Sequence, residues 1–442
     1  MTAKWSRRDF VKRAGTTAGG LVFGTALADF IAACSQGTTS GTSGGGKLEI
    51  FSWWTAGGEA DGLAELFKIY SSKYSGVKVV NATVAGGAGT NAKAVLATRM
   101  QGGKPPDSFQ VHAGQELIST WVKAGKMEPI TSIWKSENWD STIPKDLKDI
   151  VSSNGDQWSV PVNVHRGNAL WVSSKGADLM PGQGVAEPGY KISLDDFLAV
   201  LGKAQAAGIK APLALGSQGN WEVTMLLENN IVAVGGADFY RGLFNGKSSW
   251  TDNNVKTALN YIKQMLNFVN SDHPNLSWDD ASKRLIDGSS VATIMGDWAK
   301  GYFTAANWTP NKDFGGTASP GTAGTYMIVC DTFGLPKGAP DRDNAINWLK
   351  VCGSEAGQAA FNPKKGSIPA RTDVPVDIFD PIARQFIGEF KSAKLTPSIA
   401  HGSAAPGAFS DGVNDEMGQF VQKKDVNASA ANLAKLADQY LK

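Results

Sequence analysis

Strand-like and helix-like segments alternate between residues 48 and 111, and this alternation constrains the fold more than any other feature. Short apolar runs at 48–51, 77–80 and 108–111 are typical of strands. Between them, 63–74 and 91–101 carry apolar residues at helical spacing, with glycine and proline breakers around them. Strands that alternate with helices usually pair in parallel, with the helices on the faces of the sheet. We therefore expect an α/β chain that opens with a mostly parallel sheet.

The same alternation continues along the rest of the chain. The pattern predicts a strand near 169–173 and helices at 194–207, 253–270, 342–351 and 430–441. The chain has 442 residues, more than the roughly 250–300 at which a single hydrophobic core stops growing. Two domains are therefore expected.

Composition excludes several classes of protein. Lys and Arg (43) balance Asp and Glu (41), and 42% of the residues are hydrophobic, which fits neither a basic nucleic-acid binder nor a disordered chain. Three cysteines cannot build a disulfide framework, and four histidines cannot supply several zinc sites. We therefore expect no metal, no cofactor and no nucleic-acid partner.

The first 34 residues resemble an export signal. Arg7 and Arg8 precede a weakly apolar stretch, 14–31, that is too polar and too short for a stable membrane span. This order predicts a twin-arginine signal peptide over residues 1–33. Two alanines stand directly before Cys34, as in a lipobox, where the signal is cut and a lipid is attached to the thiol. An amphipathic helix with an incidental cysteine is the alternative.

The segment 34–46 follows as a tether, because nearly all its residues are Gly, Ser or Thr and cannot bury apolar surface. We expect an exported protein, in the periplasm or on the cell surface, that meets the membrane only through the lipid on Cys34.

A glycine-rich turn at 87–92 fits the pattern G-x-G-x-x-A between a strand and a helix, and Asp107 stands 20 residues past Gly87. In a dinucleotide site the acidic residue should end the following strand, whereas Asp107 precedes its strand. A nucleotide site, a plain turn, and a loop whose backbone faces a polar ligand all remain open.

Tryptophans give a stronger signal for a ligand site. The chain contains 14 of them, and several stand beside turns, among them Trp53, Trp54, Trp121, Trp221 and Trp298. An indole can cover the C–H face of a sugar ring while the hydroxyls stay free for polar groups. Trp53 and Trp54 also follow the end of a strand, where open α/β sheets bind ligands. Core packing is the alternative for each of the others.

Polar residues end two further strands. Gln110 and His112 share one face of a strand by alternation, and Asn163 and His165 repeat this arrangement. Asp297 ends an apolar run before Trp298, where it could bind a ligand or cap the following helix.

Four segments together resemble a known family: 47–54, 103–112, 295–298 and 361–368. They are similar to family 1 extracellular solute-binding proteins of bacterial ABC sugar importers, and closest to the glucose/galactose-binding lipoproteins. The resemblance extends over essentially all of 47–442.

The resemblance implies a two-lobe α/β periplasmic-binding-protein fold of type II, like maltose-binding protein, with a ligand cleft between the lobes and hinge crossovers. The implied lobes are 47–163 with 301–362 and 164–300 with 363–442, with crossovers near Val164, Met295 and Asn362. It also implies a monomer that captures a monosaccharide (glucose, or else galactose or mannose) and delivers it to the permease subunits of an ABC importer.

The same resemblance implies the residues of the sugar site, with no catalytic residue among them. The stacking residues would be Trp53, Trp54 and Trp221, and the hydroxyl ligands Glu59, Lys93, Gln110, His112, Asp297, Lys365 and His401.

Two enzyme classes are the alternatives. A secreted glycoside hydrolase would need two carboxyl groups, for which Glu59 and Asp297 are candidates. We expect nearby Lys and His residues to hold both acids ionised, with no carboxyl of raised pKa. A cofactor-dependent oxidoreductase would need the glycine-rich turn to hold a nucleotide. Separately, Cys330 and Cys352 could form a disulfide or remain buried free thiols.

Overall fold

The computed structural model describes residues 45–181 and 190–441, and these residues belong to one compact unit. The predicted signal peptide 1–33, the lipidated Cys34 and most of the tether lie outside the described residues.

The first sheet carries the predicted opening of the chain. Its central strands pair in parallel in the order β2 (Val77–Asn81), β1 (Gly46–Phe51), β3 (Ser108–His112). Two strands extend the order beyond β3: β12 (Asp331–Gly334) is antiparallel to β3, and β6 (Ser159–Pro161) is antiparallel to β12 and so runs in the same direction as β3. The prediction of a parallel opening is thus confirmed, with one antiparallel strand, β12, that the pattern did not show.

A second set of strands is mostly antiparallel. One sheet has the order β10 (Phe314–Ala318), β8 (Ala169–Ser173), β9 (Ala292–Ile294). Another has the order β13 (Lys394–Pro397), β11 (Thr325–Val329), β7 (His165–Arg166). Outside this set, β4 (Ser152–Ser153) and β5 (Asp156–Gln157) pair as a separate two-stranded ribbon.

This pairing differs from the expected division of the chain. The resemblance places residues 301–362 in the first lobe, yet β10 and β11 pair with strands of the second set. The chain passes from β11 to β12, and so from one sheet to another, at Cys330. Pairing between distant segments decides this, and local periodicity carries no information about it.

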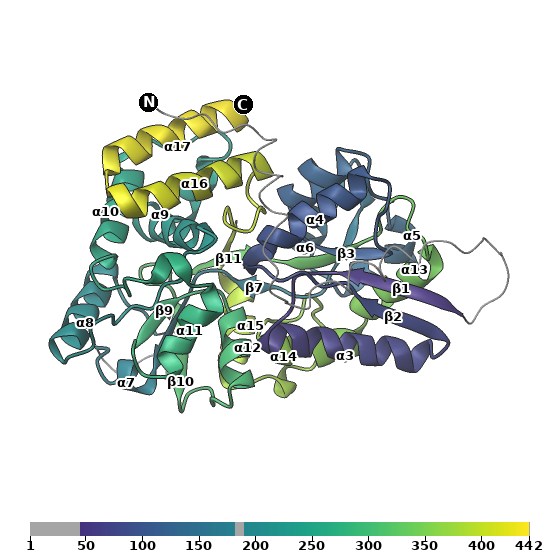
Figure 1. The fold of residues 1–442 in the computed structure, drawn as a ribbon, viewed down its shortest axis with the longest axis horizontal. Coiled ribbons are helices and arrows are strands. Elements are labelled where there is room, and N and C mark those ends of the chain that lie inside the picture. Colours follow the sequence, from purple (N-terminus) through teal and green to yellow (C-terminus); the bar gives the residue numbers. More distant parts are fainter. Residues whose placement is uncertain (1–44, 182–189, 442) are drawn as a thin grey trace, which may run out of the picture. The chain divides into compact units, whose positions relative to one another are not determined.

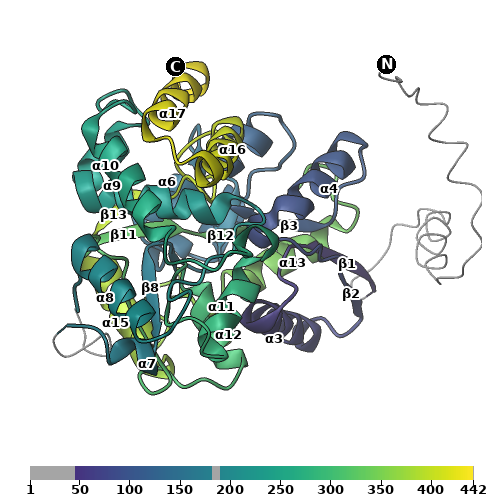
Figure 2. The same cartoon turned by 60° about the vertical axis from the view of Figure 1, so that its left-hand side comes forward.

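Helices cover both groups of strands (Figures 1 and 2). Around the first sheet lie α3 (Gly57–Lys73), α4 (Thr90–Gln101), α5 (Thr131–Ser136), α6 (Lys145–Ile150), α13 (Arg342–Cys352) and α14 (Glu355–Lys365). The remaining α-helices are α7 (Ser174–Ala177), α8 (Leu194–Ala206), α9 (Trp221–Gly242), α10 (Asn253–Met265), α11 (Trp278–Ile286), α12 (Trp298–Ala305), α15 (Pro381–Ser392), α16 (Gly407–Lys423) and α17 (Val426–Tyr440). Short 3₁₀ turns are η1 (Gly87–Gly89), η3 (Trp139–Ser141), η4 (His273–Asn275) and η5 (Val376–Ile378), and η2 (Glu116–Val122) is a π-helix.

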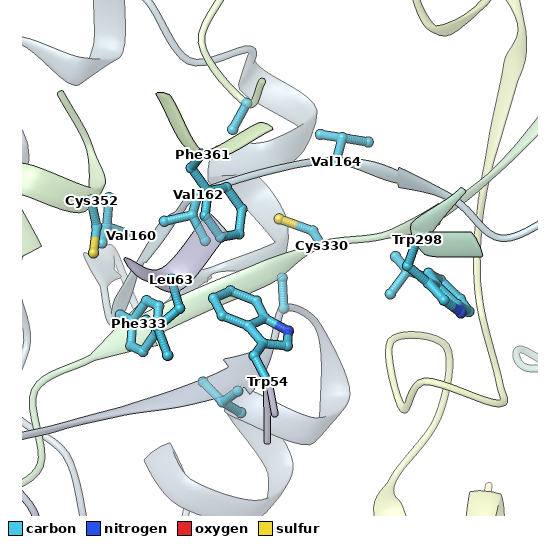
Figure 3. Packing of buried hydrophobic residues seen from close by; sticks show 14 of the residues in the cluster. Trp54, Leu63, Val160, Val162, Val164, Trp298, Cys330, Phe333, Cys352 and Phe361 are labelled. Atoms are coloured by element: carbon cyan, nitrogen blue, oxygen red, sulfur yellow. The ribbon is translucent and has the colours of Figure 1, made fainter. Parts of the chain in front are cut away.

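Two large clusters of buried apolar side chains support these two groups. The first contains Trp54, whose ring packs against those of Phe333 and Phe361 at centroid distances of 5.7 and 5.0 Å (Figure 3). The second is formed largely by α8, α9, α10 and α16. We call these clusters the first and the second core; the first also contains Trp171 of β8 and Phe314 of β10, so it extends from the first sheet into the second set of strands.

The two cysteines of the described chain are free and buried within the first cluster. Cys330 lies between β11 and β12, and Cys352 ends α13 (Figure 3). Burial raises the pKa of both thiols well above the ordinary value, so both stay neutral and unreactive.

Within the described residues, every helix falls short of the length and apolar character that a membrane crossing demands.

Candidate functional site

A cavity of about 320 Å³ opens where strand ends of the first sheet meet the starts of α9 and α12. Trp53 and Trp54 follow β1, His112 ends β3, and Asp331 begins the antiparallel β12 directly opposite His112. Its wall also includes Thr55, Ala56, Glu59, Ala85, Gly86, Gly87, Ala88, Asn91, His165, Gln218, Trp221, Ser277, Trp278, Asp279, Trp298, Val329, Lys365 and His401. The cavity thus collects residues that lie far apart in the sequence.

The tandem tryptophans make one wall of this cavity. The ring of Trp53 lies 5.0 Å from that of His112 and 5.7 Å from the ammonium group of Lys93. Trp54 is rooted in the first core and has the ammonium group of Lys365 5.4 Å from its ring centroid. Its indole nitrogen is buried and finds no hydrogen-bond partner among the described residues.

A second aromatic group faces them. Trp221 is the first residue of α9 and Trp298 the first of α12, and their ring centroids are 6.2 Å apart. His401 touches both, with its ring 5.3 Å from Trp221 and 5.0 Å from Trp298. The cavity is therefore bounded by indole rings from segments on different elements, which is the kind of surface that covers the apolar faces of a sugar.

Asp331 is the centre of the polar network at the base of the cavity. Its carboxylate accepts hydrogen bonds from Gln110 Nε2 at 2.8 Å and Asn163 Nδ2 at 2.9 Å, and His165 Nε2 lies 3.3 Å away. Burial opposes its ionisation, but His165 and the positive charge of Lys365 hold the pKa of Asp331 well below its ordinary value. Asp331 is therefore a carboxylate at neutral pH.

Glu59 and Lys365 form an ion pair in the wall. Nζ of Lys365 lies 2.7 Å from Oε1 of Glu59, and the two side chains are only 2% and 15% exposed. Burial raises the pKa of Glu59, although Lys365 opposes the rise. The expectation that no candidate acid has a raised pKa is therefore wrong for Glu59, because sequence spacing does not reveal how deeply a side chain lies.

A third charged group lies behind Trp53. Glu116 accepts from Lys93 Nζ at 2.7 Å and contacts His112 Nδ1 at 2.8 Å. Burial would raise the pKa of Glu116, but the interactions with Lys93 and His112 lower it to about 2. Lys93 therefore holds Glu116, which in turn orients the ring of His112.

Three of the predicted ligands are absent from the cavity wall. Lys93 lines a neighbouring groove. The side chain of Gln110 accepts a hydrogen bond from the Trp53 backbone N–H (3.2 Å) and donates one to Asp331. Asp297 is fully buried, bonded to His165 and to the Arg166 backbone N–H. Asp297 also stands at the N-cap of α12, yet its side chain makes no capping bond. The other predicted residues, Trp53, Trp54, Glu59, His112, Trp221, Lys365 and His401, are brought together around the cavity.

The glycine-rich turn is part of this wall, and its surroundings argue against a nucleotide. A Cβ on Gly87 would lie 3.1 Å from Trp221 Nε1, and one on Gly89 would lie 2.8 Å from Trp53. Asp107 accepts from the backbone N–H groups of Glu49 and Asp341, so it serves the fold and is not placed for a ribose. The backbone of the turn instead borders the cavity.

Several wall residues have no place in the predicted site, including Asp331, His165, Trp278 and Trp298. Asp331 follows the apolar strand β11 without any motif around it. His165 and Trp298 carry a signal, since one repeats the strand-end pattern of His112 and the other follows Asp297. No cluster of side chains among the described residues could hold a metal ion.

Comparison with known proteins places the chain in one family. Residues 44–359 match the family described as bacterial extracellular solute-binding protein. An uncharacterized ABC transporter extracellular-binding protein of Pyrococcus horikoshii is 42% identical over 389 residues, 88% of this chain and 86% of the relative. A probable sugar-binding periplasmic protein of Mesorhizobium japonicum is 33% identical, over 95% and 98% of the two chains. The glucose-binding protein GlcS of Saccharolobus solfataricus is 27% identical, over 72% and 59%.

Solved structures show the same fold at low identity. The bacterial solute receptor AcbH superposes with a TM-score of 0.78 at 17% identity, covering 90% of this chain and all of that one. The maltose-bound MalE3 of T. maritima gives 0.72 at 14% identity, covering 89% and 100%. The expected α/β periplasmic-binding-protein fold, like that of maltose-binding protein, is thereby confirmed. Together with the match over most of its length, this shows that the chain belongs to the bacterial extracellular solute-binding protein family, whose members are non-enzymatic components of transporters.

Proposed function

We propose that this protein is the substrate-binding component of an ABC importer and that it captures a neutral monosaccharide, with glucose or galactose as the first candidates. The observation that carries this proposal is the cavity of about 320 Å³ between two groups of indole rings, whose wall contains carboxylates together with basic side chains. The names of the relatives that bind glucose or other sugars support the same class of ligand.

The size of the cavity favours a small ligand. Ligand sites span about 300–1,000 Å³, and this one lies at the lower end of that range. Trp53 and Trp54 would cover one face of a pyranose, and Trp221 and Trp298 would approach from the opposite side. A longer saccharide would need space that these rings occupy.

The polar groups suit hydroxyls, each of which both donates and accepts. Asp331 and Glu59 would accept, whereas Lys365 would donate. Hydrogen bonds to charged groups contribute about 1.5–3 kcal/mol each, so a few of them with stacking suffice for micromolar affinity, which needs about −8 kcal/mol. In this arrangement Asp297 and Gln110 orient the side chains that bind the sugar and do not touch the sugar themselves.

Binding would bring the two groups of strands together around the sugar. Trp221 at the start of α9 meets Gly87 of the first group across the cavity. Val164 pairs with Ile368, and Cys330 lies close by in the passage from β11 to β12 (Figure 3). We place the hinge at these connecting segments, and closure about it would be the signal that the permease reads.

The signal pattern supports export and anchoring. The paired Arg7 and Arg8 and the two alanines before Cys34 fit twin-arginine export followed by lipid attachment to the Cys34 thiol. The sugar-binding body would then work outside the cytoplasm on a tether.

Calorimetric titration with a panel of neutral monosaccharides and their disaccharides tests this function. We expect one-to-one, saturable binding of D-glucose or D-galactose in the micromolar range or tighter, and no heat from disaccharides. Binding of a disaccharide with no response to any monosaccharide would overturn the assignment of the ligand.

A further inference from the structure

Glu228 is a fully buried acid that the proposed sugar site does not use directly. It lies two turns along α9 from Trp221, and its Oε2 accepts the backbone N–H groups of Ile399 at 2.6 Å and Ala400 at 3.3 Å. Its other oxygen, Oε1, lies 2.8 Å from the hydroxyl of Ser398. Glu228 therefore holds the loop that carries His401.

Ser398 connects Glu228 with His401. Its hydroxyl oxygen lies 3.0 Å from His401 Nδ1 and also accepts the His401 backbone N–H at 3.2 Å. A hydroxyl has one hydrogen to donate and two lone pairs to accept with. One lone pair is taken by the backbone N–H, so Ser398 must donate to one of its two remaining partners and accept from the other.

The direction of this chain fixes the tautomer of His401. When Glu228 is ionised, Ser398 donates to it and accepts from His401, so Nδ1 carries the proton and Nε2 is an acceptor. When Oε1 of Glu228 carries a proton, Ser398 accepts a hydrogen bond from it and donates its own hydrogen to Nδ1. The imidazole proton then lies on Nε2, which becomes a donor. His401 lines the sugar cavity, and no described residue is a hydrogen-bond partner of its Nε2.

We propose that Glu228 is a positioning residue that sets, through Ser398, whether His401 accepts or donates a hydrogen bond toward the bound ligand. This deepens the proposed function and rests on it for the identity of the ligand as a sugar. Glu228 thus belongs to the specificity of the site without touching the ligand, since a hydroxyl that must donate needs an accepting Nε2.

The surroundings allow both states of the chain. Burial raises the pKa of Glu228 to about 7, although Ser398 and the loop backbone oppose the rise. The hydroxyl of Tyr240 also lies 3.3 Å from Glu228 Oε2 but has Pro397 O nearer, at 2.9 Å. Both tautomers are therefore accessible near neutral pH.

His401 itself remains a neutral imidazole in either state. Burial, and then the electrostatic effects of His112 and Lys93, hold the pKa of His401 well below the ordinary value, with His165 acting in the same sense and Asp331 opposing. The only change at His401 is therefore which of its nitrogens carries the single proton.

Nitrogen NMR of the ligand-free protein tests the link, because the shifts of Nδ1 and Nε2 distinguish the two tautomers. In the wild-type protein, His401 should pass from the Nε2–H to the Nδ1–H form as the pH rises from about 5 to 9. In Glu228→Gln, the amide oxygen must face the two backbone N–H groups, so the NH₂ donates to Ser398 and His401 stays Nε2–H at every pH.

Glu416→Gln is the matched control. Glu416 is also a buried acid of the second core, bonded to Ser429 and Asn432 away from the cavity. It should leave the titration of His401 unchanged. Should Glu228→Gln not fold, Ser398→Ala cuts the chain instead and should abolish the pH dependence of the tautomer. An identical His401 tautomer at pH 9 in wild type and Glu228→Gln, or an unaltered titration in Ser398→Ala, overturns the proposal.

Calorimetry with D-glucose and a panel of deoxyfluoro-D-glucoses then measures the consequence. Fluorine cannot donate a hydrogen bond. At pH 9, the affinity of the analogue that lacks the donating hydroxyl, divided by the affinity of glucose, should therefore be about tenfold higher in Glu228→Gln than in wild type. If the ratio of analogue to glucose affinity is the same in Glu228→Gln and in wild type for every analogue, the role of Glu228 in specificity is contradicted. If glucose binds neither protein, the monosaccharide assignment fails, while the NMR result still decides the role of Glu228.

Discussion

The ammonium group of Lys365 lies 2.7 Å from the carboxylate of Glu59, and both side chains face the cavity beside Trp54. Each group is largely removed from water, so each depends on the other for its charge. In the sugar complex the same two groups would meet neighbouring hydroxyls as donor and acceptor. The pair therefore connects the stability of the empty protein with recognition of the ligand.

Glu59→Gln should destabilise the folded protein, because it leaves the charge of Lys365 buried without its partner. Removing one member of a buried ion pair costs about 3–5 kcal/mol, which urea unfolding without sugar would measure. Asp149→Asn offers the matched control, since its pair with Lys145 is largely exposed and should leave the midpoint unchanged. Equal midpoints for Glu59→Gln and wild type would show that the pair does not hold Lys365.

Acid should weaken the fold through Glu116. Its pKa is lowered from 4.5 to about 2 in the folded protein, so its contribution is complete above about 4.5 and is lost as the pH falls toward 2. The difference corresponds to about 3 kcal/mol. Glu116→Gln should therefore flatten the fall in unfolding free energy between pH 5 and 2. The same slope in both proteins would contradict the ion pair with Lys93.

Gly89→Ala should disturb the sugar site through Trp53. Gly89 has a φ of +77°, and a Cβ there would lie 2.8 Å from the Trp53 ring. Gly103→Ala is the control, because Gly103 has a φ of +66° but nothing within 4 Å of its Cβ position. Both variants should lose stability from backbone strain, yet only Gly89→Ala should lose sugar affinity in calorimetry. An equal loss of affinity in both variants would show that contact with the Trp53 ring is not the cause.

Lipid attachment can be tested separately from sugar binding. Intact-mass analysis of membrane-derived protein should show a chain that begins at Cys34 and carries a lipid adduct. Cys34→Ser should release the protein from membranes with its sugar affinity unchanged. Exported protein that retains Met1 would contradict the signal assignment.

Local pattern is sufficient for the opening of the chain and for several later elements, among them β8, α8 and α13, but it misses others. The strands and helices from β1 to β3 lie within a few residues of their predicted bounds, apart from the start of α3 at Gly57, because each has a clear period and a breaker. The long helix α9 escapes prediction since polar residues such as Glu222, Thr224 and Glu228 are buried in it, which removes the amphipathic pattern. Long-range pairing likewise decides where β10 and β11 lie.

The candidate site divides in the same way. Residue types at strand ends are sufficient to indicate Trp53, Trp54 and His112. Asp331 cannot be found from local pattern, because it becomes a site residue only when β12 pairs with β3 and brings it opposite His112. The residue type suggests that Asp297 contacts the ligand, but Asp297 is fully buried and its side chain is bonded to His165, which it orients.

The claim that a monosaccharide stacks on Trp53 and is read by Asp331 is tested most directly by the ratio of D-glucose to D-galactose affinity in two variants. Trp53→Ala removes cover that any pyranose uses, so both affinities should fall by about 2 kcal/mol, roughly 30-fold, at a constant ratio. Asp331→Asn replaces an acceptor oxygen by a donor, so it should penalise the two epimers unequally and change the ratio. Calorimetry that finds both affinities intact in both variants, with the proteins folded, would contradict the account.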